Sequence, residues 1–539
     1  MSKIFERLAE KRHLTDDFLH PQYEKRVDPF ILHDMDKAIA RIKQAIKAQE
    51  KILIYGDYDV DGVTASTVMA DALILAGINP DHLEIMLPDR FADGYGMSPK
   101  LITRTQKHQV ALVITVDCGS RNHAIIEELN VQGIDTIVTD HHETDTEMPE
   151  AIAIINPHRK DHPTESLQNL AGVGVAFKLA EALVQEQLIK KGQEKWLLDL
   201  VILGTICDSM LINNDNRRLC YYGIKVLEKT RRPGLQELMR RAGVKSINAE
   251  SIGFQIGPRL NAAGRLDTAE LSLNLLRAKS PLDAAPLAEK LEELNKKRKK
   301  EQRAATKEIE DRGITEDPVI IETGKWHEGI LGIVAGRLVD EYHKPAFVLT
   351  ELAGNIYKGS GRSFGDFNLA DALEYVKESI ISGGGHAGAA GVKVEGNNLY
   401  KFREQINEYY RSLHLPDQSK YLTQHADLDL TDFSGLTLDF LEELKQLEPY
   451  GPGNEEPIFR LKNIDLINVT RMGADRNHLR LDLRDKNGKY LKLVAFYAHE
   501  EWLNLDPQFD HIEPLIKLTE NDFNGVKSVE ARICDIIKL

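Results

Sequence analysis

Short apolar runs alternate with longer segments of helical periodicity between about residues 35 and 215. The runs are rich in β-branched residues and lie at 51–55, 83–87, 112–116, 136–139 and 151–155. Strands that alternate with helices in this way are typical of a parallel α/β sheet. We therefore predict that residues 1–215 form an α/β domain built on a parallel sheet.

A helical segment is predicted at residues 216–312, and it ends in a long connecting helix. Residues 281–311 are mostly strong helix formers with a narrow apolar stripe. The basic run at 296–300 is polar on every side, so we expect a solvated face, with contact to phosphates as the alternative. The stripe consists of Leu287, Leu291 and Leu294.

Two further domains are predicted in the rest of the chain. An apolar strand at 319–321 begins a second α/β unit at 313–412. Short segments of strict alternation predict a small β domain of the barrel type at 420–539. A chain of 539 residues is too long for a single core, which agrees with several domains.

Composition and charge narrow the class of protein. The 42% hydrophobic and 28% charged residues are typical of a soluble globular chain. A formal charge of −15 speaks against a histone-like basic coat, but it permits a nucleic acid held in one local basic groove.

The cysteines and the first residues indicate the compartment. The four cysteines form no C-x-x-C pair, which argues against a zinc ribbon or a disulfide framework. Residues 1–7 lack the apolar core of a secretory signal, and the chain has no run of about eighteen apolar residues, the length of a membrane span. We therefore expect a cytoplasmic protein.

Acidic residues and two histidines follow the predicted strands, where ligands of open α/β folds bind. Three aspartates form a turn between the first strand and a helix predicted at 67–76, and another ends a buried helical segment at 196–207. Crowded negative charge is tolerable around a divalent cation, because hard cations take oxygen ligands. The residues of this set are Asp57, Asp59, Asp61, Asp117, Asp140, His141, His142 and Asp208.

This number of ligands suits two divalent cations about 3.5–4 Å apart, the arrangement used in phosphoryl hydrolysis. Asp117 is a candidate bridging ligand. The oxygen-rich set favours Mn or Mg over zinc, and the imidazole favours Mn. Adjacent side chains of an extended chain point in opposite directions, so we expect one histidine of the pair to reach the metal and the other to face elsewhere.

The acidic turn also matches the opening of a calcium-binding EF-hand loop. Such a loop ends on a bidentate Glu, where this chain has Val68, and it follows a helix, where a strand is predicted. The EF-hand hypothesis fails on both counts.

Four motifs, taken in order, resemble those of the DHH phosphoesterase superfamily, and most closely those of the RecJ single-strand-specific exonucleases. The motifs lie at 56–62, 116–119, 140–142 and 204–208. The resemblance implies that Asp140 orients its neighbours and that His142 contacts the scissile phosphate. It implies one ion held by Asp57, Asp59 and Asp117, and a second held by Asp61, Asp117, His141 and Asp208.

The resemblance continues outside the metal motifs. Residues 257–265 place two arginines and an Asn among small residues, where guanidinium groups can bind phosphate; an arginine-containing loop between helices is the alternative. The resemblance implies that Arg259 and His386 lie near the reaction site. The substrate contacts that it implies are Arg90, Tyr95, Asn261, Arg265, His327, Ser360 and Arg362.

The segment at 383–388 contains the pattern G-x-G-x-x-G. It follows a predicted helix and precedes a predicted strand, which is the reverse of a dinucleotide-binding turn. We expect a glycine-rich wall beside a nucleic-acid backbone, with tight turns as the alternative.

The terminal β domain resembles an oligonucleotide-binding barrel, in which basic residues and stacking aromatic rings contact the strand. Taken singly, each candidate is an ordinary surface or core residue. The candidates are Arg471, Arg476, His478, Arg480, Lys492, Phe496 and Tyr497.

By resemblance, the function is that of a 5′-to-3′ exonuclease that degrades single-stranded DNA to 5′-mononucleotides with two Mn²⁺ or Mg²⁺ ions, in DNA repair and recombination. A helicase and a single-stranded-DNA-binding protein are the expected partners, and we expect a monomer. A DHH oligoribonuclease or cyclic-dinucleotide phosphodiesterase is an alternative, which the terminal barrel would argue against. A catalytically inactive DNA-binding replication protein is another, against which the intact metal motifs argue.

Overall fold

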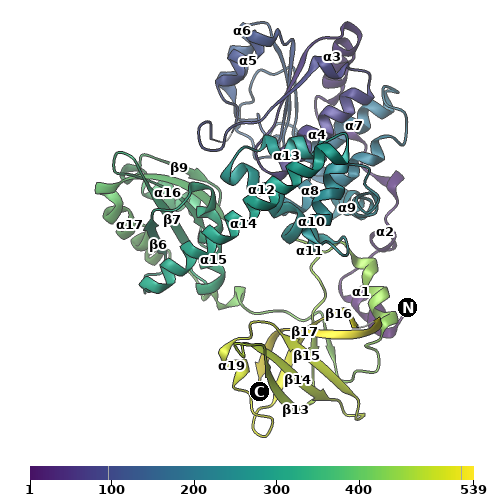
Figure 1. Cartoon of the computed structure of the whole chain (residues 1–539), viewed down its shortest axis with the longest axis vertical. Helices are drawn as coiled ribbons and strands as arrows, with labels where there is room; N and C mark the ends of the chain where they lie inside the picture. The colour runs from purple at the N-terminus through teal and green to yellow at the C-terminus, as the bar shows by residue number, and fades with distance from the viewer. Residues whose placement is uncertain (95, 524) are drawn as a thin grey trace. The chain divides into compact units, whose positions relative to one another are not determined.

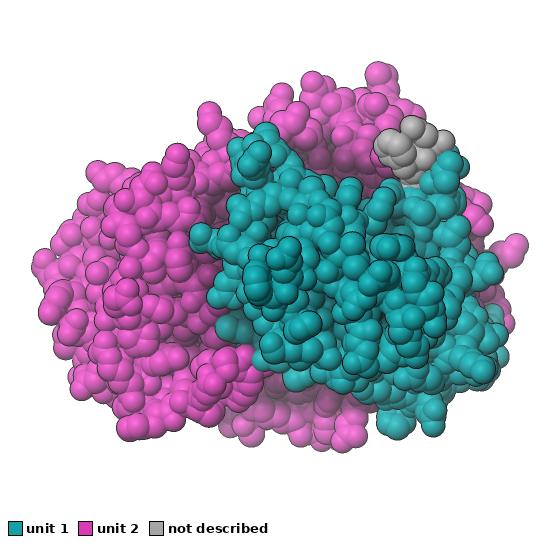
Figure 2. Space-filling view, turned by 90° about the horizontal axis from the view of Figure 1, so that it is seen from below, with its two compact units in different colours: residues 1–26, 211–221, 421–539 teal, residues 27–210, 222–420 magenta. Residues whose placement is uncertain are grey.

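The computed structural model describes residues 1–94, 96–523 and 525–539. The chain divides into two compact units, which Figure 2 shows in separate colours. The larger unit consists of Val27–Met210 and Tyr222–Lys420, and the smaller of Met1–Arg26, Leu211–Tyr221 and Tyr421–Leu539.

A five-stranded parallel sheet forms the first part of the larger unit. Its strand order is β2-β1-β3-β4-β5, and the side chains of β1 and β3 are fully buried. The predicted α/β domain with a parallel sheet is confirmed, and each predicted apolar run overlaps one of the strands. They are β1 (Ile52–Tyr55), β2 (Leu83–Met86), β3 (Leu112–Val116), β4 (Asp135–Thr139) and β5 (Ala153–Ile155).

Helices cover this sheet, with α4 (Val60–Leu75) packed against α7 and α8 (Figure 1). The helix α4 begins earlier than the predicted helix at 67–76, because Asp59 caps it by accepting a hydrogen bond from the Gly62 amide at 3.0 Å. Asp61 therefore lies in the first helical turn. The other helices here are α3 (Met35–Ala48), α5 (Lys100–His108), α6 (His123–Val131), α7 (Gly172–Gln185) and α8 (Leu198–Cys207).

The helical segment ends in α14 (Pro281–Arg312), the long connecting helix that was predicted (Figure 1). The basic run on this helix is not solvated all round, because Arg298 is buried. The preceding elements are α9 (Asn214–Leu227), α10 (Pro233–Ala242), α11 (Ala249–Ser251), the π-helix η6 (Ile252–Ile256), α12 (Gly257–Leu266) and α13 (Glu270–Leu276).

A second five-stranded sheet, in the order β6-β7-β8-β10-β9, follows α14. Val348 and Ile320 pack on one side with α14 and α15, and Phe347 and Ile321 pack on the other with α16 and α17. Its elements are β6 (Ile320–Gly324), η7 (Glu328–Ile330), α15 (Leu331–Tyr342), β7 (Ala346–Leu352), β8 (Ile356–Arg362), α16 (Leu369–Tyr375), β9 (Ser382–Gly385), β10 (Ala389–Glu395) and α17 (Leu399–Ser412).

The glycine-rich segment forms the edge of this second sheet. Gly383, Gly384 and Gly385 lie on β9 and pair with β10 in antiparallel register. Dinucleotide binding requires a turn between a strand and a helix, but these glycines form a strand, in agreement with the prediction. The strand also excludes the alternative of a tight turn at these three glycines.

The smaller unit contains a seven-stranded sheet in the order β11-β12-β16-β17-β15-β14-β13. This sheet agrees with the predicted terminal β domain. The strands are β11 (Leu428–Leu430), β12 (Phe459–Leu461), β13 (Asp465–Met472), β14 (His478–Arg484), β15 (Tyr490–Ala495), β16 (Ile512–Phe523) and β17 (Val526–Lys538), accompanied by α18 (Leu438–Leu444) and α19 (Glu500–Leu503).

The first residues of the chain belong to the core of this smaller unit. Phe5 and Leu8, on α1 (Lys3–Lys11), are buried in one cluster with Phe440 and Phe459. The Ser2 amide donates to Glu443 Oε1 at 2.7 Å, across 441 positions of sequence. Separately, none of the described helices, in either unit, is both long enough and apolar enough to span a bilayer.

Candidate metal centre

Carboxylates and imidazoles from four segments of the chain meet at the carboxyl edge of the parallel sheet. They follow β1, β3, β4 and α8. Their ligand atoms form three groups, and the atoms of each group lie within 4.8 Å of one another. The groups are Asp57 with Asp59 and Asp117, Asp61 with His141 and Asp208, and Asp117 with His141 and His142.

Asp117 belongs to two of these groups and has an unusual backbone conformation. Its φ of 60° lies in the left-handed region, which costs free energy for a residue other than glycine. Its amide donates to Thr139 O at 3.0 Å, so that the end of β3 is tied to the end of β4. This conformation places a carboxylate that is 2% exposed between the groups.

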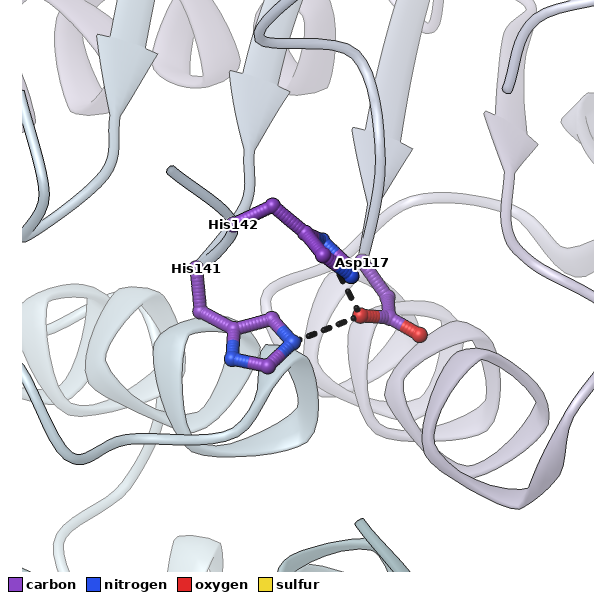
Figure 3. A group of neighbouring side chains, drawn as sticks. All are labelled: Asp117, His141 and His142. Carbon is purple, nitrogen blue, oxygen red and sulfur yellow. Dashed lines mark ion pairs between the residues drawn. The ribbon is translucent and has the colours of Figure 1, made fainter. Parts of the chain in front are cut away.

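Both imidazoles of the histidine pair point toward Asp117 (Figure 3). His141 Nε2 lies 3.1 Å and His142 Nδ1 3.9 Å from the same Oδ1 atom. The prediction that one histidine faces elsewhere is therefore wrong. Asp140 Oδ1 accepts hydrogen bonds from the His141 and His142 amides at 2.8 and 3.2 Å, which bends the chain out of the extended conformation assumed.

Asp140 uses both oxygens within the protein. Oδ2 accepts from the Ser120 amide at 3.0 Å, and Oδ1 lies 2.8 Å from His142 Nδ1. Burial alone would raise the pKa of Asp140, but the hydrogen bond to His142 and the charge of that ring hold it below its ordinary value. Burial likewise opposes protonation of His142, yet the hydrogen bond and charge of Asp140 raise its pKa to about 9.

Burial and mutual repulsion raise the pKa of four aspartates. The pKa values of Asp57 and Asp117 lie well above the ordinary range, because both are buried and have further carboxylates beside them. The same two causes raise the pKa of Asp61 to about 7 and of Asp208 to about 8. Burial and the charge of His142 lower the pKa of His141 to about 3, which keeps it in the neutral form that ligates metals.

Glycines allow these carboxylates to approach one another. A Cβ at Gly204 would lie 2.6 Å from Asp61 Oδ1, and one at Gly172 would lie 2.6 Å from Asp117 Cβ. The Gly172 and Val173 amides donate to Asp61 at 2.6 and 2.9 Å, so the N-terminus of α7 stabilises that charge. The sequence motifs did not point to Gly172, because only packing reveals its role.

Among the described residues, Asp57 Oδ1, Asp117 Oδ1 and His141 Nε2 are buried at this edge and form no hydrogen bond, although the last two atoms lie 3.1 Å apart as an ion pair. Buried polar atoms are nearly always satisfied, so atoms without partners require an explanation. Carboxylate oxygens with one imidazole nitrogen are the ligands that Mn²⁺ and Mg²⁺ accept. The residues present therefore fit divalent cations.

A cluster of four arginines adjoins this centre, and we call it the arginine cluster. Burial, followed by the charges of Arg90, Arg298 and Arg362, lowers the pKa of Arg265 to about 9. Within the described residues, none of the four forms an ion pair with a carboxylate, so the cluster suits an anion. Their neutral partners are Gly329 O for Arg265 at 3.3 Å, Gly361 O for Arg362 at 2.7 Å, Asn295 Oδ1 for Arg298 at 3.0 Å and the Tyr58 ring for Arg90 at 5.0 Å.

The first turn of α15 adds to the arginine cluster. A Cβ at Gly332 would lie 2.9 Å from Arg362 Nη2 and 3.0 Å from Ser360 Oγ. The N-terminus of a helix carries partial positive charge and unsatisfied amides, which favour an anion. Ser360 and Arg362, both predicted as substrate contacts, therefore lie beside a second source of positive potential.

Other predicted site residues have different surroundings. Arg259 forms an ion pair with Glu292 at 2.6 Å, and its predicted place near the reaction stays a prediction. His327 Nδ1 accepts a hydrogen bond from the Gly329 amide at 3.1 Å and thereby caps η7. His386 is exposed beyond β9, and its role near the reaction likewise stays a prediction. Tyr95 lies outside the described residues.

Arg298 was not among the predicted site residues. The sequence contained a signal for it, because residue 298 continues the apolar stripe of Leu287, Leu291 and Leu294 at helical spacing. Because Arg298 is charged, it was not counted with the apolar stripe, and the whole basic run was predicted to face solvent.

Family models match three parts of the chain. Residues 51–205 match the DHH family N-terminal domain, 316–412 the DHHA1 domain and 427–535 the RecJ OB domain. The last match argues against the alternative of a DHH phosphodiesterase that lacks a terminal barrel.

Relatives resemble the chain over nearly its whole length. It is 35% identical to a single-stranded-DNA-specific exonuclease RecJ of Bacillus subtilis (strain 168), over 96% of this chain, and it spans 65% of that relative, just under two thirds. It is 30% identical to the Haemophilus influenzae exonuclease of the same name, over 98% of this chain and 95% of the relative.

A solved structure resembles the fold. The crystal structure of RecJ in complex with Mn²⁺ from Thermus thermophilus superimposes with a TM-score of 0.84 at 28% identity, covering 99% of this chain and 76% of that one. The Thermus protein was also crystallised with Mg²⁺, a structure that matches with a TM-score of 0.78 at 25% identity over 99% and 74% of the two chains.

The raised carboxylate pKa values predict how stability changes with pH. Without cations, the folded chain binds more protons at Asp61 and Asp208 than the unfolded chain does, so its stability falls as pH rises toward 8. With chelator present, we expect the thermal unfolding midpoint to decrease as the pH is raised from 6 to about 8.5. In Asp208→Asn this decrease with pH should be smaller. Differential scanning calorimetry would measure both, and a midpoint that rises over this range would contradict the assignment.

The close approach at Gly204 predicts a packing effect on metal binding. In Gly204→Ala the new methyl group displaces the Asp61 carboxylate, and we expect Mn²⁺ affinity to fall about ten- to hundredfold, as for other residues that support a ligand. Isothermal titration calorimetry would measure the Mn²⁺ affinity of the variant and of the wild type. The matched control is Gly336→Ala on α15, where a Cβ meets nothing within 4 Å and affinity should not change. Equal affinities in the two variants would refute the role of Gly204.

Proposed function

Because the chain belongs to the RecJ family of single-stranded-DNA-specific exonucleases, we propose that it removes nucleotides from the 5′ end of single-stranded DNA and releases 5′-mononucleotides. The observation that carries this proposal is the arginine cluster, which forms no ion pair with a carboxylate of the described residues and lies beside the candidate metal ligands. An anion pocket next to a hydrolytic centre suits a strand whose terminal phosphate is held while the adjacent linkage is cut.

We assign two divalent cations, Mn²⁺ or Mg²⁺, to this centre. The three buried ligand atoms that form no hydrogen bond with any described residue support the assignment. When bound, two such cations polarise a phosphodiester and activate water for in-line attack. One would be held by Asp57, Asp59 and Asp117, and the other by Asp61, Asp117, His141 and Asp208.

His142 is proposed to face the phosphate that is cut. Its raised pKa gives the ring a positive charge at neutral pH in the metal-free chain, and its hydrogen bond to Asp140 fixes the direction of the ring. A positioned cation stabilises negative charge that develops on phosphate oxygens. Asp140 thus acts as a positioning residue.

The arginine cluster, with Ser360 and the first turn of α15, is proposed to bind the terminal 5′ phosphate. A terminal phosphate carries about −1.5 to −2 charges at pH 7, whereas an internal linkage carries about one. Four cations that form no ion pair within the described part of the chain favour the more highly charged end. Recognition of that charge would direct cleavage to the 5′ terminus.

The remaining assignments rest on the family resemblance. We propose that Asn261, His327 and Tyr95 contact the strand and that Arg259 and His386 lie near the reaction. We also propose four domains, at 1–215, 216–312, 313–412 and 420–539, the last binding single-stranded DNA; residues 1–26 and 211–215 of the first pack with the last, as the smaller unit shows. We further propose that the protein is a monomer and acts in the cytoplasm, in DNA repair and recombination. Its proposed partners are a helicase and a single-stranded-DNA-binding protein.

Removal of the shared carboxylate tests the hydrolytic centre. Asp117→Ala is expected to lower hydrolysis of 5′-phosphorylated single strands by more than about a hundredfold, beyond the effect of residues that only support a ligand. Release of mononucleotides with Mn²⁺ would be measured, with Asp145→Ala, an exposed aspartate, as the control. Undiminished hydrolysis by the Asp117→Ala protein would overturn the cation assignment.

Recognition of the 5′ phosphate is tested at Arg298. We expect Arg298→Met to reduce the preference for a 5′-phosphate over a 5′-hydroxyl strand about ten- to hundredfold, the value of a charge-assisted hydrogen bond. The control is Lys297→Met, an exposed cation one position earlier on α14 that lies near Glu301. If both variants retained the preference for the 5′-phosphate strand, Arg298 would not contribute to phosphate recognition.

A further inference from the structure

An accessible stripe of side chains runs along η6 and α12. Phe254, Pro258, Asn261 and Arg265 are exposed or half-buried, as are Gly253, Gln255 and Leu266 beside them, whereas residues 256–257, 259–260 and 262–264 are buried. Spacings of four, three and four residues place the four side chains on one face of a helix. We call this face the α12 stripe.

The α12 stripe runs beside the metal centre. A Cβ at Gly257 would lie 2.4 Å from Cys207 Sγ, and one at Gly264 would lie 2.7 Å from Tyr58 O. Cys207 directly precedes Asp208, and Tyr58 directly precedes Asp59. The glycine face is therefore packed against the ligand-bearing segments, and the α12 stripe, one residue further on, lies about 100° around the helix from it.

The two ends of the α12 stripe differ in chemistry. Arg265 is a member of the arginine cluster. Asn261 follows, and among the described residues its side chain has no hydrogen-bond partner. Phe254 forms the far end, on the π-helix η6, and its side chain is 76% exposed. Short π-helices frequently occur at functional sites, and a ring this exposed contributes little to folding.

We propose that Phe254 is the stacking platform for a base on the 3′ side of the cleaved linkage. The proposal rests on the proposed exonuclease function, which places the 5′ phosphate at the other end of the stripe. The eleven positions from Arg265 to Phe254 span about 16 Å of helix. That length reaches at most about five nucleotides from the 5′ end at the ~3.4 Å spacing of stacked bases.

A platform at this place would hold the strand while the nucleotide next to the 5′ end is released. Stacking on an aromatic ring does not discriminate between bases, because each base has a π-face. Retention through Phe254 is therefore compatible with degradation of any sequence. Stacking on Phe254 would add a contribution to strand binding that does not depend on charge, unlike the phosphate contacts.

Strands with one abasic site at successive positions from a 5′ phosphate test the proposal. The wild-type chain is expected to lose about tenfold in kcat/KM at one internal position, the effect of one lost stacking contact. Phe254→Ala should lose about as much on the intact strand and become insensitive to the abasic site at that position. Phe254→Trp should retain the wild-type pattern, whereas Phe254→Leu, which has no ring, should behave as Phe254→Ala.

The control variant is Tyr400→Ala, which removes a ring of similar exposure, 75%, from α17. It should match the wild type on every strand. The proposal would be overturned if Phe254→Ala and the wild type had equal kcat/KM on the intact strand. It would also be overturned if an abasic site at the same position lowered kcat/KM equally in both proteins. Neither result would affect the proposed exonuclease function. A wild-type chain that neither binds nor degrades 5′-phosphorylated strands would overturn both.

Discussion

Repulsion between buried carboxylates is the constraint on which the larger unit depends. Asp57, Asp61 and Asp117 lie where water is excluded, and each would be neutral or unpaired in the absence of a positive charge. The surrounding chain supplies partial compensation through the N-terminus of α7, which donates two hydrogen bonds to Asp61. The left-handed conformation of Asp117 is a second cost of bringing these groups together.

The same constraint explains why small residues surround the centre. Side chains that repel one another stay close only if the backbones carrying them are also close, and Gly172 and Gly204 provide that proximity. Asp140 has a different function in the group. It accepts hydrogen bonds from its own neighbours and so aligns both imidazoles with one oxygen of Asp117.

The parallel sheet was predictable because each buried strand is a short apolar run, and the aspartates were predictable because they follow such runs. The beginning of α4 was missed, since Val60 to Gly62 are weak helix formers and the cap at Asp59 is visible only in three dimensions. The orientation of His142 was predicted wrongly because alternation holds for strands, and hydrogen bonds to Asp140 turn this segment into a loop.

The arginine cluster shows a further limit of pattern analysis. Its members come from four distant segments, and burial of Arg298 beside Asn295 contradicts the usual position of a lysine-rich helix face in water. Motifs identified Arg90, Arg265 and Arg362 singly. None of the four forms an ion pair with a carboxylate that the structure describes, and this property, which indicates an anion pocket, is visible only in the folded chain.

The discontinuous make-up of the smaller unit has a consequence for biosynthesis. Phe5 and Leu8 belong to a core whose other buried members, apart from Leu19, come from residues 428–536, and the Ser2 amide donates to a residue 441 positions later. At about 5–20 residues per second, a ribosome needs roughly 20–90 seconds to cover that distance. During this interval the apolar face of α1 emerges without its partners, so the amino-terminal segment waits for strands and helices that are synthesised several hundred residues later.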